Sequence, residues 1–374
     1  MQRLFFAAAA LCLLFFSAPA EAAQMVGARA AIVIDATTGR VLFEQNAAEQ
    51  LPIASTTKIM TALLALEQPG INTVFEVDSN AIQVEGSSMG LQAGDKASLY
   101  ALAQGMLLAS GNDAANAAAV RIAGSLSGFT DLMNERAAEL GMMNTSFQTP
   151  SGLDGEAHYS TAYDMALLAS QALKNPRFAD ICSQYRMQAS YGNPPYQRWL
   201  VNHNKLLSYY EPAIGVKTGF TKKSGRCLVS AAQRDGITLI CVTLNCPDDW
   251  NIHEQFYEQC FPMQQIAELS GGIPIPDIAV AGGAGSFVRA VPYNTARLPI
   301  PSADTDKLSY RIYVPAFIYA PVRSGQSLGQ AEVVYEGETL AAFTLVSDRD
   351  IELLHSYEEK ISLWSRISAL FGFD

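Results

Sequence analysis

The stretch Ala54-Ser55-Thr56-Thr57-Lys58-Ile59-Met60-Thr61-Ala62 contains an S-x-x-K pair ahead of an apolar run. The pattern predicts a helix over roughly Ser55 to Leu66, on which Ser55 and Lys58 share a face. A hydroxyl is a poor nucleophile until a base removes its proton, and an amine can be that base once burial and a nearby cation lower its pKa. The stretch therefore indicates a serine nucleophile that a lysine activates. A helix-capping serine beside a solvated lysine is the simpler alternative.

A second pattern, Ser110-Gly111-Asn112, lies between two Ala- and Leu-rich stretches that predict helices. At such a junction a serine can offer a hydroxyl for proton transfer, and an asparagine can offer an amide for hydrogen bonding to a substrate. Ser, Gly and Asn are also ordinary loop residues, so the pattern alone indicates little.

A third pattern, Lys217-Thr218-Gly219, continues into Phe220-Thr221 and predicts a β-strand. A glycine there would let a ligand lie against the strand edge. Lys217 supplies a cation and Thr218 a hydroxyl, and both suit a substrate carboxylate. Taken alone, the tripeptide is better explained as an exposed edge strand with a solvated lysine.

The chain around these patterns predicts one α/β domain, because strands occupy both ends of the segment and helices lie between them. Its antiparallel sheet would come from the two chain ends, with Asp235-Gly236 as a tight turn. The predicted elements are strands at Ala30 to Asp35, Arg40 to Glu44, Gly215 to Thr221, Cys227 to Arg234 and Ile237 to Asn245, and a helical subdomain from about Ser98 to Leu173.

Composition changes after about Pro262, and Gly271 to Pro276 is typical of a linker. Short strands between Gly and Pro residues then predict a small all-β module from Ile278 to Val346. The last segment, Glu358 to Phe373, predicts an amphipathic helix with Ile361, Trp364, Ile367 and Phe371 on one face. Such a helix can lie in a membrane interface or dock on its own domain.

The chain has 374 residues and a net charge of -11, which argues against binding to nucleic acid. Residues 1–22 predict a signal peptide with cleavage after Ala22, so we expect export from the cytoplasm. Five of the six cysteines follow that site, and none forms a C-x-x-C pair. Zinc binding by these thiols is therefore not expected, whereas one or two disulfides are possible.

The three patterns lie on a predicted helix, a loop and a strand, in that order. They match the S-x-x-K, S-x-N and K-T-G set of penicillin-binding proteins and serine β-lactamases. Over roughly residues 24 to 350 the chain closely resembles the low-molecular-mass serine-type D-alanyl-D-alanine carboxypeptidases. Other stretches close to that family's form are Gly86 to Gly94, Met106 to Ala115, Ser151 to Asp154 and His158 to Ala162. The resemblance implies a β-lactamase/transpeptidase-like α/β domain over 23–262, a small all-β domain over 275–350 and a membrane-associating helix over 358–374.

By this resemblance, Ser55 attacks the carbonyl between the two terminal D-alanines of a peptidoglycan stem peptide, and Lys58 takes its proton. Ser110 relays a proton to the leaving D-alanine, while Lys217 holds the charge of the network. The backbone N–H groups of Ser55 and Phe220 would form the oxyanion hole.

The resemblance also assigns the substrate contacts. Asn112 would hold the amide on the acyl side, and Thr218 and Thr221 would lie near the terminal carboxylate, beside Gly219. Water would then hydrolyse the acyl-enzyme without a cofactor or a metal. β-Lactam antibiotics would acylate Ser55 as substrate mimics at the outer face of the cytoplasmic membrane or in the cell wall.

The sequence departs from the family where the substrate carboxylate would be held. Related enzymes commonly carry an arginine in the loop after the strand that ends at Asn245, and here that loop has none. It has Asp248 and Asp249 instead, whose negative charges would repel a substrate carboxylate. The stretch Asn202-His203-Asn204-Lys205, which can also hold an arginine, offers only His203.

Other kinds of enzyme fit less well. Gly86-Ser87-Ser88-Met89-Gly90 matches G-x-S-x-G, but Asn80 to Glu85 is a poor core strand for a nucleophile elbow. The four histidines lack metal-ligand spacing, which argues against a zinc peptidase, and His158 is expected to pack in a loop.

The enzymatic alternative is a β-lactamase. Class A enzymes use a separate glutamate to activate water, and Glu139 with Asn144 does not match that E-x-x-x-N pattern. An endopeptidase acting on crosslinked peptidoglycan is another option within the fold. A non-catalytic cell-wall-binding protein is disfavoured by the intact set of Ser55, Lys58, Ser110 and Lys217.

Overall fold

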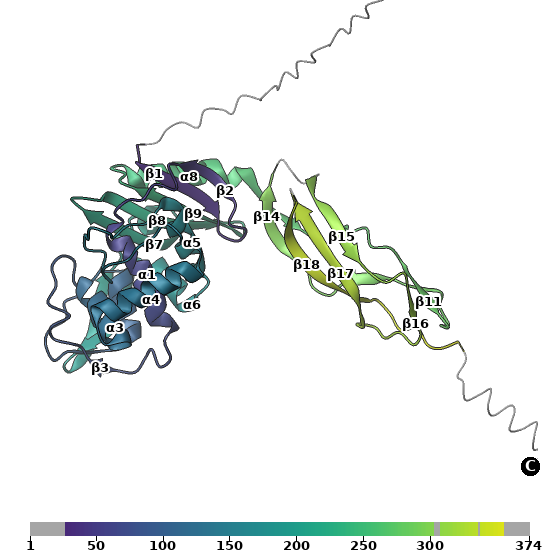
Figure 1. Ribbon diagram of the computed structural model, residues 1–374, viewed down its shortest axis with the longest axis horizontal. Coiled ribbons are helices and arrows are strands. Elements are labelled where there is room, and N and C mark those ends of the chain that lie inside the picture. Colours follow the sequence, from purple (N-terminus) through teal and green to yellow (C-terminus); the bar gives the residue numbers. More distant parts are fainter. Residues whose placement is uncertain (1–26, 303–306, 336, 355–374) are drawn as a thin grey trace, which may run out of the picture.

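The computed structural model describes residues 27–302, 307–335 and 337–354. The predicted signal peptide and the predicted C-terminal helix lie outside the described residues. A mixed α/β body forms one end of the molecule, and an elongated β module extends from it (Figure 1). Among the described residues, every helix is too short or too polar to cross a bilayer.

The body is built on a five-stranded antiparallel sheet whose strands come from both ends of the segment, as predicted. Its order is β2-β1-β9-β8-β7, with bounds β1 (Ala30–Asp35), β2 (Val41–Gln45), β7 (Ala213–Thr221), β8 (Gly225–Arg234) and β9 (Ile237–Leu244). The Asp235-Gly236 turn between β8 and β9 is also confirmed, since both residues have positive φ. β7 is an edge strand, so one side of it is open to the helical part of the body.

Helices cover both faces of this sheet (Figure 1). α8 (Asp249–Cys260) packs on one face, and the larger hydrophobic core lies on the other, where α1 (Lys58–Glu67) and α5 (Ala162–Leu173) pack. The remaining helices are α2 (Leu99–Leu107), α3 (Asn112–Ala123), α4 (Leu126–Glu139), α6 (Pro176–Ser183) and α7 (Leu206–Tyr209). The predicted helical subdomain therefore corresponds to α2 through α5.

Two features of the body differ from the sequence prediction. The helix expected from Ser55 begins at Lys58, because a short 3₁₀ turn, η1 (Ala54–Thr57), precedes it. A second, four-stranded sheet was not predicted; it contains β3 (Phe75–Glu76), β4 (Lys96–Ala97), β5 (Arg186–Gly192) and β6 (Pro195–Val201). Five of the seven residues of β6 are exposed, so the strand lacks the apolar alternation that marks a buried strand.

The β module contains three small sheets. β10 (Gln264–Glu268) follows η2 (Phe261–Met263) and precedes the Gly271 to Pro276 stretch. It pairs with β14 (Arg297–Pro301), which lies after that stretch. A three-stranded sheet follows the order β12-β11-β16, with bounds β11 (Ile278–Ala281), β12 (Phe287–Val288) and β16 (Phe317–Tyr319). A four-stranded sheet follows the order β13-β18-β17-β15, with bounds β13 (Ala290–Pro292), β15 (Ser309–Tyr313), β17 (Ser327–Tyr335) and β18 (Glu338–Ser347).

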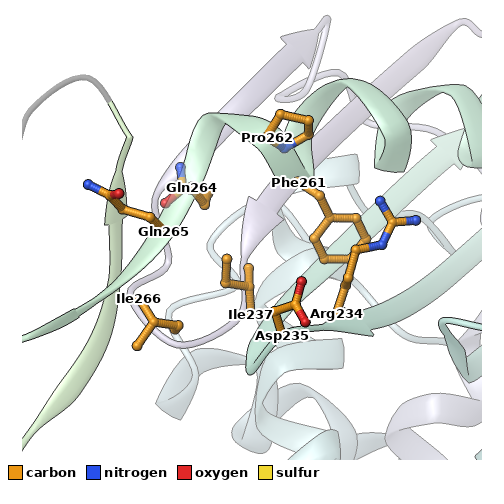
Figure 2. Close-up of a pocket in the computed structure, with 8 residues that line it drawn as sticks. All are labelled: Arg234, Asp235, Ile237, Phe261, Pro262, Gln264, Gln265 and Ile266. Carbon is orange, nitrogen blue, oxygen red and sulfur yellow. The ribbon is translucent and has the colours of Figure 1, made fainter.

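A pocket of about 430 Å³ lies where the chain passes from the body to the module (Figure 2). Arg234 lies over the ring of Phe261 on one side of it, and Ile266 of β10 lines another side. The guanidinium of Arg234 also pairs with Glu258 of α8. The pocket is therefore lined by residues of the body and by the first strand of the β module.

The five cysteines that follow the predicted cleavage site are all buried and unpaired. The disulfides that the sequence left open are therefore absent from the described residues. Burial raises the pKa of the Cys182 thiol to about 12, so this sulfur stays protonated near neutral pH and acts as an apolar packing group.

Candidate active site

Ser55 lies in the η1 turn, whose shape is set by its neighbours. Ala54 has a φ of 47°, a left-handed conformation that a residue with a Cβ rarely adopts. Two buried threonines hold it: the Thr56 hydroxyl donates to the carbonyl of Ile53 at 2.6 Å, and the Thr57 hydroxyl donates to that of Ala54 at 2.8 Å. The turn therefore presents Ser55 in a fixed direction at the start of α1.

Gly152 packs against the backbone of the same turn. A Cβ at this position would lie 2.0 Å from the carbonyl oxygen of Ala54 and 2.8 Å from the Thr57 hydroxyl, and its φ is 85°. His158 completes the support, since its Nε2 is 2.8 Å from that hydroxyl and its Nδ1 accepts from the backbone N–H of Gln148. His158 thus packs in a loop, as expected, and positions the turn that carries Ser55.

Lys58 is fully buried beside Ser55. Its Nζ donates to the Ser55 Oγ at 2.8 Å and to the carbonyl of Ser151 at 2.6 Å. Burial holds the pKa of Lys58 well below its usual range, and the positive charge of Lys217 lowers it further, against an opposite effect of Asp113. A buried amine with a lowered pKa is what a general base near neutral pH requires. The solvated-lysine alternative is therefore wrong.

Lys217 of β7 is also buried, with 1% of its surface exposed. Its Nζ donates to the Ser110 Oγ at 2.9 Å and to the carbonyl of Thr218 at 2.8 Å. Burial lowers the pKa of Lys217 to about 7. A hydrogen bond thus joins the Ser110 and Lys217 patterns. The positive charge of Lys217 also lowers the pKa of Lys58, which belongs to the first pattern.

Ser110 lies between α2 and α3, and Asn112 is the first residue of α3, at the helix junction that the sequence predicts. Ser110 has a φ of 58°, and Asn112 is 4% exposed. The Asn112 Nδ2 donates to the carbonyl of Glu85 at 2.6 Å. Its Oδ1 is buried without a hydrogen-bond partner in the described part of the chain. Because a buried amide oxygen normally accepts a hydrogen bond, this atom is available to a donor from a ligand or a neighbouring side chain.

The Gly86 to Gly90 stretch is a supporting loop, and its match to a nucleophile elbow is coincidental. The Ser88 hydroxyl donates to Asp113 Oδ2 at 2.6 Å. The backbone N–H groups of Met89, Gly90 and Leu91 donate to the same carboxylate. Asp113 thereby fixes this loop against the start of α3, next to Asn112.

The remaining predicted residues line the free edge of β7. Gly219 packs against η1: a Cβ there would lie 2.9 Å from the Ile53 carbonyl oxygen and 3.2 Å from the Ser55 nitrogen. The glycine is therefore needed for contact with the chain itself, which the sequence did not predict. Phe220 is 66% exposed, and the Thr221 hydroxyl donates to Asp154 at 3.1 Å.

Arg226 on β8 is a cation beside the K-T-G strand that the sequence patterns did not predict. It is the register partner of Phe220, so both side chains are on the face away from Lys217. Its Nη2 donates to Asp249 Oδ1 at 2.7 Å, and its guanidinium lies over Trp250. The pairing with Arg226 also explains the acidic loop, because it compensates the buried Asp249. The sequence signal for Arg226 was an arginine on the strand that follows the K-T-G strand.

The hydrogen-bond partners of the nucleophile distinguish two of the enzymatic alternatives. In the described ranges, Ser55 and Lys58 bond to each other and to a backbone carbonyl, and to no carboxylate. A class A β-lactamase would need a glutamate there to activate the deacylating water. This geometry favours a peptidase over such a β-lactamase.

Comparisons with known proteins agree with this geometry. Residues 17–248 match the family model described as D-alanyl-D-alanine carboxypeptidase, and residues 269–353 match that of the penicillin-binding protein 5 C-terminal domain. The chain is 32% identical to the D-alanyl-D-alanine carboxypeptidase DacF of Bacillus subtilis (strain 168), over 87% of this chain and 86% of that protein. The crystal structure of penicillin binding protein 5 from Haemophilus influenzae is similar with a TM-score of 0.67 and 25% identity, over 88% of this chain and 98% of that one.

Proposed function

The chain belongs to the D-alanyl-D-alanine carboxypeptidase family, and we propose that its reaction passes through an acyl-enzyme on Ser55. The observation that carries this proposal is the 2.8 Å hydrogen bond between the Ser55 Oγ and the fully buried amine of Lys58. A neutral Lys58 takes the hydroxyl proton as the Ser55 oxygen attacks the carbonyl carbon between the two D-alanines.

The second pair serves the leaving group. As the C–N bond breaks, the departing D-alanine nitrogen needs a proton, and we assign its delivery to the Ser110 hydroxyl. Lys217 holds that hydroxyl at 2.9 Å and supplies positive charge to the site. Water then attacks the ester carbonyl, which releases the shortened peptide and restores the Ser55 hydroxyl. A β-lactam would form the same ester, and its opened ring would keep the leaving amine attached.

The substrate would lie along the free edge of β7. The backbone N–H groups of Ser55 and Phe220 are assigned to the carbonyl oxygen that becomes charged. The Asn112 amide is assigned to the peptide group on the acyl side, an assignment that its buried, unpartnered Oδ1 supports. Thr218 and Thr221 are assigned to the terminal carboxylate, with Gly219 keeping the edge against η1.

We add Arg226 to the carboxylate site. Thr218 faces Leu228 and Phe220 faces Arg226, so Thr218 and Arg226 are diagonal neighbours on one face of the sheet. Diagonal cross-strand neighbours lie within reach of a long side chain. Arg226 would thus provide the positive charge that the loop after β9 lacks, and Asp249 would hold its guanidinium in place.

Release of D-alanine from a stem pentapeptide, compared with hydrolysis of nitrocefin, tests this function. We expect the purified protein to release D-alanine from the pentapeptide and to turn over nitrocefin poorly. Ser55→Ala should abolish D-alanine release, whereas Ser127→Ala, at an exposed serine of α4, should leave it unchanged. Fast nitrocefin turnover without D-alanine release would instead identify a β-lactamase.

We further propose that the protein is exported and associates with a membrane through residues 358–374. The family acts on the cell wall, which lies outside the cytoplasm, and the sequence of that segment is amphipathic. Deleting residues 358–374 should weaken the association of the protein with membranes in a fractionation experiment. Unchanged membrane association after the deletion would refute the anchor.

A further inference from the structure

The three-stranded sheet β12-β11-β16 has one face that nothing in the described chain covers. Ala279 of β11 is the register partner of Phe287 on one side and of Phe317 on the other, and Ala281 is the partner of Tyr319. Side chains of paired residues are on the same face of a sheet. The three aromatic side chains therefore share one face, separated by small alanines.

The opposite face of the same sheet is the core of the β module. Ile278, Val280 and Val288 are buried there, and Ile318 packs against them. The alternation along β11 and β16 thus turns aliphatic residues inward and aromatic residues outward. An outward aromatic row is unusual, because the exposed side of a half-buried sheet is normally polar.

Phe287, Phe317 and Tyr319, which we name the aromatic face, are 58%, 51% and 73% exposed. Phe317 and Tyr319 pack edge to face, with ring centroids 5.4 Å apart and an interplanar angle of 86°. Contiguous exposed apolar groups of this kind mark contact with another apolar surface.

The position of the aromatic face points to its partner. β11 and β16 lie at the end of the module remote from the body (Figure 1). The described chain also ends here, because Leu353 bridges to Gly283 and the Leu354 N–H donates to the Gly282 carbonyl at 2.9 Å. Both leucines are largely exposed, at 49% and 61%. Leu354, the last described residue, therefore lies at the same end of the module as the aromatic face.

We propose that the aromatic face contacts the lipid bilayer surface, as a second membrane contact beside the segment 358–374. Phenylalanine and tyrosine rings suit the level of lipid headgroups, where an apolar ring and a hydroxyl can both be satisfied. The adjoining segment carries Ile361, Trp364, Ile367 and Phe371 with helical spacing, so two apolar surfaces would be tethered side by side.

Charge around the aromatic face indicates how it binds. Four acidic residues, Asp277, Asp348, Asp350 and Glu352, and three basic ones, Arg289, Arg323 and Arg349, lie in the segments that flank the sheet, and several pair with each other. This surface has no excess of positive charge for anionic lipid. Contact with the bilayer therefore rests on apolar insertion and depends weakly on anionic lipid content and salt.

The arrangement would also orient the enzyme. The aromatic face and the α/β body occupy opposite ends of the elongated molecule (Figure 1). With the far end of the module on the bilayer, the β module would act as a spacer, and the edge of β7 would be held away from the lipid. Substrate in the wall layer would then be reached without release of the anchor.

Vesicle sedimentation of the full mature chain tests the proposal. The probe is neutral phosphatidylcholine vesicles, alone or with added phosphatidylglycerol. The variant Phe287→Ser/Phe317→Ser/Tyr319→Ser should lower the partition coefficient by roughly tenfold or more, because three aromatic surfaces leave the bilayer. The matched control Tyr293→Ser/Tyr313→Ser changes two exposed aromatic residues elsewhere in the module and should bind vesicles like the parent.

Parental vesicle binding by the triple variant would overturn the proposal. If the triple variant changed from dimer to monomer with unchanged vesicle binding, the aromatic face would instead bind a second copy of the chain, and the proposal would be overturned. Loss of binding to peptidoglycan alone would also overturn it. D-alanine release from a soluble pentapeptide should stay at the parental level, which separates this inference from the assignment of the active site.

A gain-of-signal probe covers the case in which the triple variant folds poorly. In a Trp364→Phe background, Phe317→Trp places a reporter on the aromatic face, while Trp199 and Trp250 are in the body. Brominated phosphatidylcholine should quench the fluorescence of this added tryptophan. The same brominated vesicles should leave a Tyr313→Trp control unquenched, and equal quenching of both would contradict the proposal.

Discussion

Two buried lysines beside two serines carry the proposed chemistry of this protein at the level of single residues. Lys58 and Lys217 are both desolvated, and each donates to a serine hydroxyl. Like charges oppose each other at short range, so the protonated state of one lysine favours the neutral state of the other. In the proposed mechanism, Lys58 is therefore the neutral base and Lys217 the cation.

This coupling predicts how the pH dependence responds to Lys217→Gln. Lys58 acts only when neutral, so the rate of acylation falls as pH drops through its lowered pKa. Removing the positive charge of Lys217 raises the pKa of Lys58, and the acid limb should move to higher pH. The measurement is the rate of Ser55 acylation by a fluorescent penicillin across pH. An acid limb that stays in place or moves to lower pH would contradict the coupling.

Arg226 gives a second prediction. Arg226→Leu should raise KM for a D-Ala-D-Ala substrate about 10- to 100-fold with a smaller change in kcat, because a charged hydrogen bond contributes about 1.5–3 kcal/mol. For a substrate with an amidated C-terminus the loss should be small. Since Arg226→Leu alone leaves Asp249 buried and unpaired, Arg226→Leu/Asp249→Asn is the structural control. Equal losses for both substrates would exclude a carboxylate contact.

Among the elements, the η1 turn determines where the nucleophile points. It is held between Gly219 of β7 and Gly152 of the loop before α5, and both positions lack room for a Cβ. Its threonine hydroxyls donate to the backbone carbonyls of Ile53 and Ala54, and α1 continues from it with Lys58 one turn beyond Ser55. The geometry of the Ser55–Lys58 pair therefore depends on two glycines remote in sequence.

Gly152→Ala tests this dependence. The added methyl group would lie 2.0 Å from the Ala54 carbonyl oxygen, and the φ of 85° adds backbone strain. We expect acylation by penicillin to slow by about 100-fold, since a displacement near 1 Å can cost that much. Gly141→Ala, also at positive φ but with open space around it, is the control for strain alone. Similar acylation rates in the two variants would contradict this dependence.

Burial explains which strands the sequence predicted and which it did not. The sheet strands β1, β8 and β9 were predictable because both of their faces are buried and their sequences are apolar. β6 was missed because solvent covers most of it. The site residues Ser55, Lys58, Ser110 and Lys217 were predictable from spacing, whereas the roles of Gly152 and Arg226 depend on contacts between distant segments that spacing does not encode.

At the level of the whole molecule, the α/β body and the β module have separate hydrophobic cores. One contact at their junction is the ring of Tyr335 under the guanidinium of Arg40. Units with separate cores tend to unfold independently.

Calorimetry of the full chain should therefore resolve two unfolding transitions. Acylation by penicillin fills only the site in the body, so it should raise one midpoint by a few degrees and leave the other unchanged. A Ser55→Ala protein should show no shift with penicillin. A single cooperative transition that moves as a whole would indicate that the two parts are energetically one unit.

The proposed mechanism requires Ser55 to be the acylated residue. Intact-protein mass spectrometry after brief exposure to penicillin, followed by peptide mapping, locates the adduct. We predict one penicilloyl group per chain on Ser55, its absence in Ser55→Ala and a much slower appearance in Lys58→Ala. An adduct on Ser88 or Ser110, or an adduct that persists in Ser55→Ala, would contradict the assignment of Ser55 as the nucleophile.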